Sequence, residues 1–378
     1  HRITVNRENS IPGKILRRRK RIMNTMALPG THPVTQKLTS NLTIIVPAFN
    51  EVEIIADTIK SLQFQTMPAA EIIVVDDCST DGTGDIARAY GVTVVRPPTN
   101  TGSKAGAQNY ALELVTTNLT MAIDADTILA PDAIEILLRA LDDPEVVAAC
   151  GSVLPRHVHT LWERGRYIEY LLAFTFYKPI QEYYEKPLIS SGCFSVYRTE
   201  VLRNNQGWNR RTMAEDMDLT WTFYQAGHKV RFVPEAVCYP IEPHSFPFMR
   251  RQLKRWSHGF IQNVQLHWRG ILNVPCLRSL VGVAMWDAVV ASLAYLFLIP
   301  LLAILTGNPW FLLGYLIDIP AVIIPVVYAA IARRELGQAL TSLPSFFILR
   351  LVNSIFILEA LWTEMVLHRQ LKVYEKGH

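Results

Sequence analysis

The chain has 378 residues, of which 50% are hydrophobic, and it carries a formal net charge of only +4. Its mean hydropathy of +0.16 is high for a purely soluble protein, and the small net charge argues against a nucleic-acid-binding protein. The length allows two domains, or one domain together with a membrane part.

The first 40 residues form a basic segment that contains the run KILRRRKR at 14–21. Beside a membrane part, such a run is expected at the cytosolic membrane surface, where each basic residue contributes about 1 kcal/mol of attraction to anionic lipid. A solvated, disordered tail is an equally good interpretation, and the two are compatible. We find no cleavable signal peptide, and because the chain opens on His1 we expect upstream residues, which could include another membrane span.

Short apolar runs alternate with helical stretches from residue 42 onward. This βαβαβαβ order predicts a parallel sheet covered by helices on both faces. The predicted strands are 42–49, 71–77, 92–97 and 119–126, and the predicted helices are 51–62, 84–90 and 105–115.

Acidic and amide side chains follow three of the predicted strands. Ligands of such sheets bind beyond the carboxyl ends of the strands, so the set favours a binding site. Asp124 and Asp126 would face the same side of an extended chain and repel each other unless a cation lies between them. For this pair alone, a solvated acidic turn is the alternative. The residues of the set are Asn50, Glu51, Asp76, Asp77, Asp124 and Asp126.

Two amphipathic segments, 161–178 and 246–268, follow the sheet region and mix aromatic with charged residues. Both suit helices at a membrane interface, and both could also be surface helices packed on the domain. The five cysteines lie far apart without a CxxC pair, which fits reduced thiols in the cytosol. They are Cys78, Cys150, Cys193, Cys238 and Cys276.

Three apolar stretches at 280–305, 309–331 and 343–367 are each long enough to cross a bilayer. Arg333 and Arg334 suit the cytosolic side, so three full spans would place the basic tail outside. Either the third stretch is re-entrant or interfacial, or the tail breaks the positive-inside rule; we favour three spans. Ionisable residues within the stretches could line a polar path or pair structurally, and we favour pairing. They include Asp287, Asp318 and Arg350.

Five sequence blocks stand in a fixed order along the chain. They are VPAFNE (46–51), VVDDCSTDGT (74–83), AIDAD (122–126), AEDMD (214–218) and QLKRW (252–256). This set resembles the membrane-integrated family 2 glycosyltransferases, which include cellulose, hyaluronan and poly-N-acetylglucosamine synthases. The resemblance implies an α/β nucleotide-sugar-binding domain of GT-A type, with a mixed, mostly parallel sheet, followed by interfacial helices and a transmembrane helical region. The implied bounds are 41–245, 246–275 and 280–367, with a tail at 368–378.

The resemblance also implies how the sugar donor is held. Asp124 and Asp126 would bind Mg²⁺ or Mn²⁺ against the diphosphate of the donor. Lys104, in TGSKAGAQN, could reach the same diphosphate, although a loop that closes onto a helix would look alike. The donor-binding residues are Pro47, Glu51, Asp76, Asp77, Lys104, Asp124, Gln252 and Arg255.

On the acceptor side, Asp216 is implied as the general base and Glu215 as its orienting neighbour. A helix cap formed by these two acids is compatible with that role. Many relatives have threonine before the acidic pair, where this chain has Met213-Ala214, a difference that could alter hydrogen bonding to the base. The implied acceptor-binding residues are Trp256, Ser191, Gly192 and Cys193.

The implied function is inverting transfer from a UDP-sugar, such as UDP-N-acetylglucosamine, to a growing β-linked polysaccharide. The protein would be integral to the inner membrane, as a monomer or homo-oligomer, with a cytosolic catalytic domain. The nearest alternative adds one sugar to a membrane lipid. A remote alternative is a non-catalytic export subunit that senses nucleotide-sugar, against which the retained acidic residues argue.

Overall fold

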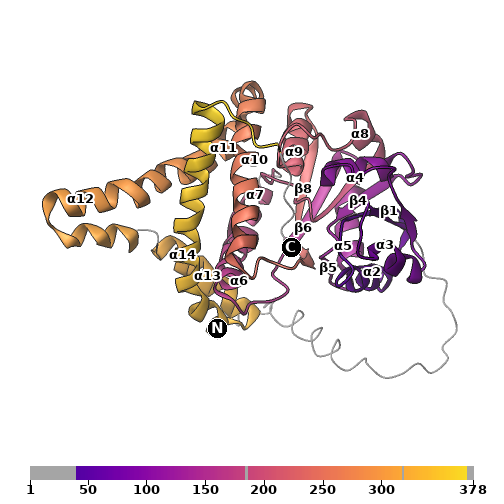
Figure 1. The fold of residues 1–378 in the computed structure, drawn as a ribbon, viewed down its shortest axis with the longest axis horizontal. Coiled ribbons are helices and arrows are strands. Elements are labelled where there is room, and N and C mark those ends of the chain that lie inside the picture. Colours follow the sequence, from indigo (N-terminus) through magenta and orange to yellow (C-terminus); the bar gives the residue numbers. More distant parts are fainter. Residues whose placement is uncertain (1–39, 184–185, 317–318, 373–378) are drawn as a thin grey trace, which may run out of the picture. The chain divides into compact units, whose positions relative to one another are not determined.

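The computed structural model describes residues 40–183, 186–316 and 319–372. The basic run at 14–21, Asp318 and the end of the basic tail lie outside these residues. One sheet of eight strands has the order β3-β2-β1-β4-β7-β6-β8-β5 (Figure 1). The strands are β1 (Ser40–Ala48), β2 (Ala69–Asp76), β3 (Thr93–Val95), β4 (Leu119–Ile123), β5 (Ile128–Leu129), β6 (Val146–Val153), β7 (Phe194–Arg198) and β8 (Lys229–Tyr239).

The first half of the sheet is parallel, as the alternation of strands and helices predicted. β1 pairs with both β2 and β4, and β2 pairs with β3. β7 then runs antiparallel between β4 and β6, and β5 runs antiparallel to β8. β6 and β8 are parallel. The sheet is therefore mixed, in agreement with the expected fold class.

Helices cover both faces of the sheet, because successive side chains of β1 point to opposite faces and both sets are apolar. Leu42 and Ile44 face one buried cluster, and Ile45 faces the other. The first cluster includes residues of α2 (Ile55–Gln63), α3 (Thr83–Ala89) and α5 (Ala133–Leu138). The second includes residues of α4 (Lys104–Leu112), α8 (Thr199–Asn204) and α9 (Glu215–Gln225).

Strand register brings four loops to one rim of the sheet. Ala48 of β1 lies opposite Asp76 of β2, and the parallel β4 ends at Ile123, one residue past the pair of Ala122 with Ile45. Because β7 is antiparallel, its first residue, Phe194, lies opposite Ile123, the last residue of β4. The loops after β1, β2 and β4 therefore meet the loop that precedes β7.

Helices make up most of the remaining described chain. The α-helices are α6 (Leu161–Leu172), α7 (Lys178–Tyr183), α10 (Phe246–Asn273), α11 (Pro275–Met285), α12 (Ile299–Thr306), α13 (Ile319–Arg333) and α14 (Leu336–Leu361). The π-helical turns are η2 (Ala173–Tyr177), η3 (Trp286–Ala291), η4 (Ala294–Leu298) and η6 (Trp362–Val366), and the 3₁₀ segments are η1 (Arg139–Asp142) and η5 (Pro309–Leu316).

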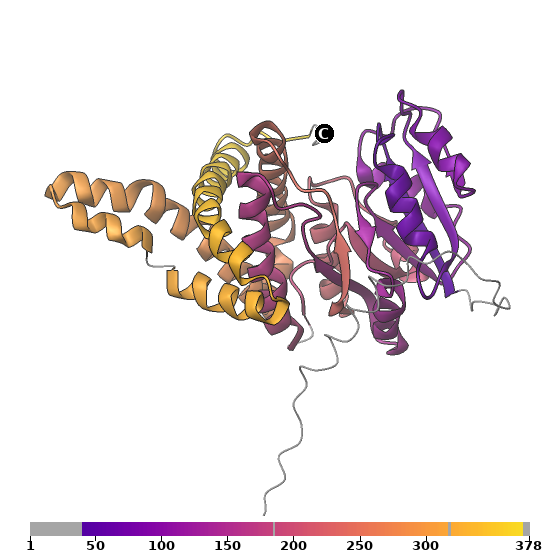
Figure 2. The same cartoon turned by 90° about the horizontal axis from the view of Figure 1, so that it is seen from below.

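Three helical stretches of the described chain are long and apolar enough to cross a membrane: Pro275–Thr306, Pro309–Arg333 and Leu336–Val366. They coincide with the stretches predicted from the sequence. Both views show α12 and η5 projecting away from the sheet, whereas α14 lies next to α10 and α6 (Figures 1 and 2). Arg350 donates to Asp287 at 2.9 Å. This contact supports the interpretation that the two charges pair structurally, rather than the alternative that they line a polar path.

Candidate active site

Five residues singled out from the sequence come together at the rim. The Lys104 ammonium contacts the Asp124 carboxylate and donates to the Gly192 carbonyl at 2.9 Å. The same Nζ lies 3.9 Å from Glu215 Oε1. The Gly192 N–H donates to Asp216 Oδ2 at 2.9 Å. We call these five residues the rim cluster. Lys104 lies close to the carboxylates of Asp124 and Glu215, and Gly192, in the loop before β7, connects it to Asp216.

Two helix starts place Lys104, Glu215 and Asp216 of the rim cluster. Lys104 opens α4, where the Ser103 hydroxyl accepts from the Gly106 N–H and caps the helix. Asp216 lies in the first turn of α9, and its Oδ1 accepts from the Met217 N–H at 2.8 Å. Negative charge is favoured at this end of a helix. Both oxygens of Asp216 are thus oriented by backbone N–H groups.

Glu215 is largely buried, with 12% of its side chain exposed. Burial raises its pKa; Lys104 and Arg255 act in the opposite direction, and the neighbouring Asp216 raises the pKa further. The net pKa of Glu215 is above its ordinary value. Because its charge lowers the pKa of Glu215, Arg255 of the QLKRW block interacts electrostatically with the rim cluster.

Asp124 and Asp126 follow β4 and supply the oxygen donors that Mg²⁺ and Mn²⁺ prefer. Asp126 Oδ1 accepts from the Thr127 hydroxyl at 3.0 Å, and Asp124 contacts Lys104. Within the described ranges, no group of three or more His, Cys, Asp or Glu side chains is arranged to hold a metal. By the chemistry of their oxygen donors, Asp124 and Asp126 suit a divalent ion.

Asp76 and Asp77 bind the loop that follows β3. Asp77 is 5% exposed and accepts from the N–H and hydroxyl of Thr101 at 2.8 and 2.9 Å. Asp76 accepts from Arg96 Nη1 at 2.5 Å. The sequence analysis missed Arg96, which is inside the third predicted strand, and Thr101, which follows it, because it considered only acidic and amide side chains.

The loop after β1 is bonded to the loop after β2. The buried Glu51 donates its N–H to the Thr83 hydroxyl at 2.8 Å. Asn50 adopts a left-handed backbone, with φ of 56°, and its side chain accepts from the Thr80 N–H. Pro47 lies in β1 beside this loop. These contacts place Pro47 and Glu51 at the same rim as Asp76 and Asp77.

The QLKRW block divides between two sets of partners. The buried Arg166 of α6 donates to Gln252 Oε1 at 2.6 Å, and its guanidinium carbon lies 4.6 Å from the centre of the Trp256 ring. Arg166 also pairs with Glu242 at 3.3 Å. Gln252 and Trp256 therefore both contact Arg166, whereas the charge of Arg255 lowers the pKa of Glu215. The sequence analysis missed Arg166, because nothing distinguishes it from the other charged residues of the same amphipathic segment.

The loop before β7 carries the remaining acceptor-side candidates. Lys178 donates to the Ser191 hydroxyl at 2.8 Å. Burial raises the pKa of the neighbouring Cys238 thiol well above its ordinary value. All five cysteines are free. The structure therefore brings Ser191, Gly192 and Cys193 to the rim together.

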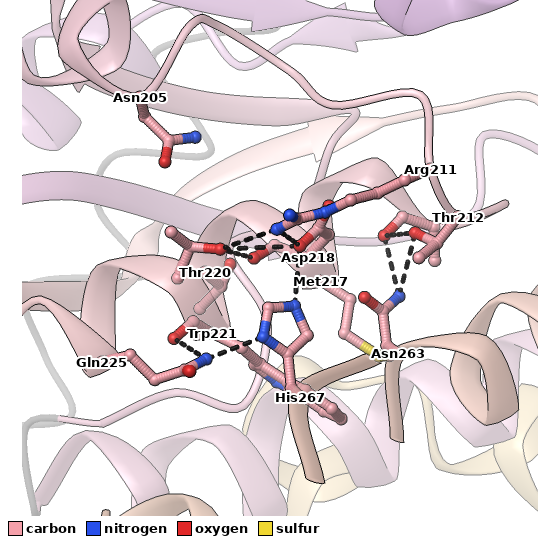
Figure 3. Close-up of polar contacts among 12 residues, drawn as sticks. Asn205, Arg211, Thr212, Met217, Asp218, Thr220, Trp221, Gln225, Asn263 and His267 are labelled. Carbon is pink, nitrogen blue, oxygen red and sulfur yellow. Dashed lines mark hydrogen bonds and ion pairs between the residues drawn. The ribbon is translucent and has the colours of Figure 1, made fainter. Parts of the chain in front are cut away.

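A second polar cluster joins α9 to α10 (Figure 3). The buried Asp218 accepts from Arg211 Nε and Nη2 at 2.8 and 2.7 Å, and His267 Nε2 lies 2.7 Å from Asp218 Oδ1. Gln225 Nε2 donates to His267 Nδ1 at 2.7 Å. Because Nδ1 accepts, the proton of a neutral His267 is on Nε2 and is donated to Asp218. This cluster fastens α9 to α10.

The segment just before Glu215 is also held by α10. Asn263 Nδ2 donates to the Ala214 carbonyl at 3.1 Å, and Gln262 Oε1 accepts from the Met213 N–H at 2.9 Å. Gly259 allows this close approach, since a Cβ there would lie 2.7 Å from the Ala214 Cβ. The Met213-Ala214 pair is thus packed directly against α10.

Asp218→Asn is expected to lower the thermal midpoint of unfolding by roughly 5 °C. The variant loses the ion pair with Arg211 and the charge-assisted bond from His267, about 2 kcal/mol in total, at about 2–4 °C per kcal/mol. Tryptophan fluorescence on heating measures the midpoint. Asp85→Asn, at a side chain 83% exposed, is the matched control and should leave it unchanged.

The effect of Asp218→Asn is expected to depend on pH. Burial acts to raise the pKa of Asp218, but the bonds from His267 and Arg211 outweigh it, so its pKa lies below the ordinary value. A depressed pKa stabilises the fold above the unfolded value of about 4, and this contribution disappears as pH falls through the folded pKa. The difference in midpoint should therefore shrink below pH 4; an equal difference at pH 7 and pH 3 would contradict the assignment.

Residues 43–205 match the family model described as glycosyl transferase family 2. Poly-beta-1,6-N-acetyl-D-glucosamine synthases of Staphylococcus epidermidis and Staphylococcus aureus are 24% and 25% identical to the chain over 223 residues. This region is 58% of the chain and 54% of each synthase, so the chain spans about half the length of the curated relatives it matches.

A solved structure is similar over nearly all of the chain. The mannosyltransferase PcManGT from Pyrobaculum calidifontis, in complex with GDP-Man and Mn²⁺, aligns over 94% of both chains with a TM-score of 0.59 and 20% identity. At this identity the likeness shows a shared fold. It confirms the expected GT-A type. Residues 43–205 therefore resemble a glycosyltransferase family 2 domain, the fold is of GT-A type, and three helices in the C-terminal region of the described chain are long and apolar enough to cross a membrane.

Proposed function

We propose that the protein is an inverting, metal-dependent hexosyltransferase that moves a sugar from a UDP-sugar onto a growing β-linked polysaccharide at the membrane. The rim cluster carries this proposal, because it sets Asp216, Lys104 and Asp124 around one loop of the sheet edge. Homology to poly-N-acetylglucosamine synthases supports N-acetylglucosamine as the transferred sugar.

Asp216 is the proposed general base. The N–H groups of Gly192 and Met217 orient its carboxylate, which takes the proton of the acceptor hydroxyl as that oxygen attacks the anomeric carbon. Attack opposite to the leaving diphosphate inverts the configuration, so an α-linked donor gives a β-linked product. Glu215 shapes the charge around the base.

Lys104 and Arg255 are proposed to neutralise the charge that develops on the leaving diphosphate. Asp124 and Asp126 would hold Mg²⁺ or Mn²⁺, which acts as a Lewis acid on the same oxygens when bound. The nucleoside side of the rim is assigned to Pro47, Glu51, Asp76 and Asp77.

Trp256 is proposed to stack against the acceptor sugar. It is 38% exposed, and Arg166 lies over its ring and holds it. The loop of Ser191, Gly192 and Cys193 would border the same acceptor. Arg166 donates to Gln252 and pairs with Glu242, so we assign Gln252 a supporting role on the donor side.

The catalytic domain is proposed to face the cytosol from the inner membrane. Free cysteines suit a reducing compartment, and the apolar helices provide membrane attachment. The UDP-sugar and the growing polysaccharide would meet the rim from that side.

The proposal is tested with the full chain in nanodiscs, offered each common UDP-sugar and GDP-mannose with Mg²⁺ or Mn²⁺. Nucleotide release and product size are measured, with Asp216→Asn as the inactive control. Release from UDP-N-acetylglucosamine with a long polymer supports the proposal. A single sugar on added lipid would assign the protein to glycolipid synthesis, and tight nucleotide binding without turnover would indicate a sensing subunit.

Gly192→Ala is expected to lower the rate of nucleotide release roughly 10-fold to 100-fold while the protein stays folded. A Cβ at this position would lie 3.1 Å from Asp216 Oδ2 and 3.3 Å from Lys104 Nζ, so one of them must move by a few tenths of an ångström. Small displacements of reacting groups have effects of this size. Gly337→Ala, with no atom within 4 Å, should retain full activity; equal rates for the two variants would show that the close contact is unimportant.

A further inference from the structure

Both ends of the third apolar stretch, Leu336–Val366, contact helices of the catalytic side. Before its start, Glu335 accepts from the Tyr167 hydroxyl of α6 at 3.0 Å. Near its end, Glu364 Oε1 lies 2.7 Å from His258 Nδ1 and accepts from Gln262 Nε2 at 2.8 Å, both on α10. These contacts are separated by roughly 40 Å of helix, at 1.5 Å per residue. That length is about the full thickness of a bilayer with its headgroups.

Further contacts join the second half of α14 to α10 and α6. Glu359 pairs with Lys254 of α10 at 3.0 Å, and Asn353 donates to Glu169 of α6 at 3.3 Å. Figures 1 and 2 agree in showing α14 side by side with α10. Lys254 contacts Glu359, and His258, further along α10, contacts Glu364, further along the chain. The two helices therefore run in the same direction.

The charge of α10 excludes it from the hydrocarbon core. Its first turns carry Arg250, Arg251, Lys254 and Arg255, and each would cost about 2.5–3.5 kcal/mol at the centre of a bilayer. The far end of α10 is fastened to the catalytic domain through the bond between His267 and Asp218. Because the second half of α14 packs along the charged first half of α10, this part of α14 must lie at the same depth.

We infer that α14 and η6 lie at the membrane surface beside α6 and α10 and do not cross the bilayer. Their outer face, which includes Ile348, Ile355 and Trp362 at 42%, 53% and 59% exposed, fits the boundary between headgroups and acyl chains of a lipid surface. The spanning part is then a hairpin of Pro275–Thr306 and Pro309–Arg333.

This arrangement satisfies the positive-inside rule, which three full spans would break. The segment after η6 folds back onto α10: Leu371 donates to Glu364 at 2.9 Å, and its carbonyl accepts from Gln262 at 3.0 Å. Arg369 and Lys372 therefore lie on the same side as Arg333 and Arg334.

Thiol labelling tests the side of the tail. Single cysteines are introduced at Phe64, Asn308 and Arg369, all exposed, and the full-length variants are treated with a membrane-impermeant maleimide in spheroplasts and in inverted vesicles. The unsubstituted protein sets the background. We expect Arg369→Cys to label together with Phe64→Cys, on the catalytic domain, and opposite to Asn308→Cys, between the two spans. Labelling of Arg369→Cys together with Asn308→Cys would overturn the inference.

Depth measurement tests the position of α14 itself. A spin label at Ile355→Cys, in vesicles of phosphatidylcholine and phosphatidylglycerol, is compared with one at Leu293→Cys, an exposed site at the middle of the first span. Accessibility to oxygen and to a polar nickel reagent reports depth. The Ile355 label should lie roughly 5–10 Å into the interface, and the Leu293 label near the centre. Equal depth would refute surface placement, and neither result depends on transferase activity.

Discussion

Asp216→Asn is expected to lower kcat about 10³-fold while the KM for the donor stays within a factor of a few. Asparagine keeps the size of the side chain and can still accept one backbone N–H bond, but it cannot take the proton of the acceptor hydroxyl. General-base catalysis typically contributes about 10²–10⁴-fold. Because the donor contacts of Lys104 and Arg255 are unaffected, binding of the nucleotide-sugar should persist. Initial rates of nucleotide release against donor concentration separate kcat from KM.

The control for Asp216→Asn is Asp85→Asn, the same substitution at a surface carboxylate. It should keep the wild-type kcat. Circular dichroism and the thermal midpoint must show that both variants are folded. A folded Asp216→Asn protein that retains a tenth of the wild-type kcat would rule out Asp216 as the base, and Glu215 would become the next residue to test.

Lys104→Met is expected to lower kcat/KM by roughly 10²–10³-fold, or about 3–4 kcal/mol of transition-state stabilisation. Lys104 is 12% exposed and contacts both Asp124 and the Gly192 carbonyl. Methionine fills a similar volume without charge, so the leaving diphosphate loses a cation and the rim cluster keeps three carboxylates. Calorimetric titration with UDP and Mg²⁺ should show weaker binding as well.

Lys60→Met is the matched control for Lys104→Met, because Lys60 is exposed on α2 and lies over the Tyr90 ring. Its rate and its affinity for UDP should equal those of the wild type. If Lys104→Met kept more than a third of the wild-type kcat/KM, the cation that stabilises the diphosphate would have to be Arg255 alone.

The strands at the start of the chain could be predicted because their signal is local. β1, β2 and β4 are apolar runs that end in polar residues, and the helices between them have their own periodicity. The rim residues Asp76, Asp77 and Asp124 followed from the same pattern, since parallel strands end at one edge. The motif order supplied the family before any contact was known.

The second half of the sheet could not be predicted. β7 pairs antiparallel with β4 across more than 70 residues of sequence, and no local pattern encodes that register. This pairing brings Gly192 to Asp216 and Lys104. Arg166 was missed for the same reason: its partners Gln252 and Trp256 are on another helix, far along the chain.

The sequence by itself determined the class of domain, the order of its motifs, the acidic pairs and the presence of apolar helices, because periodicity and composition depend on neighbouring residues. Only the tertiary structure decided which carboxylates share Lys104, that Gln252 and Trp256 are held by Arg166, and that α14 packs along α10. Hydropathy measures how strongly a helix avoids water. Whether such a helix crosses the bilayer or lies on it depends on the charged helix it packs against, and that contact is set by the fold.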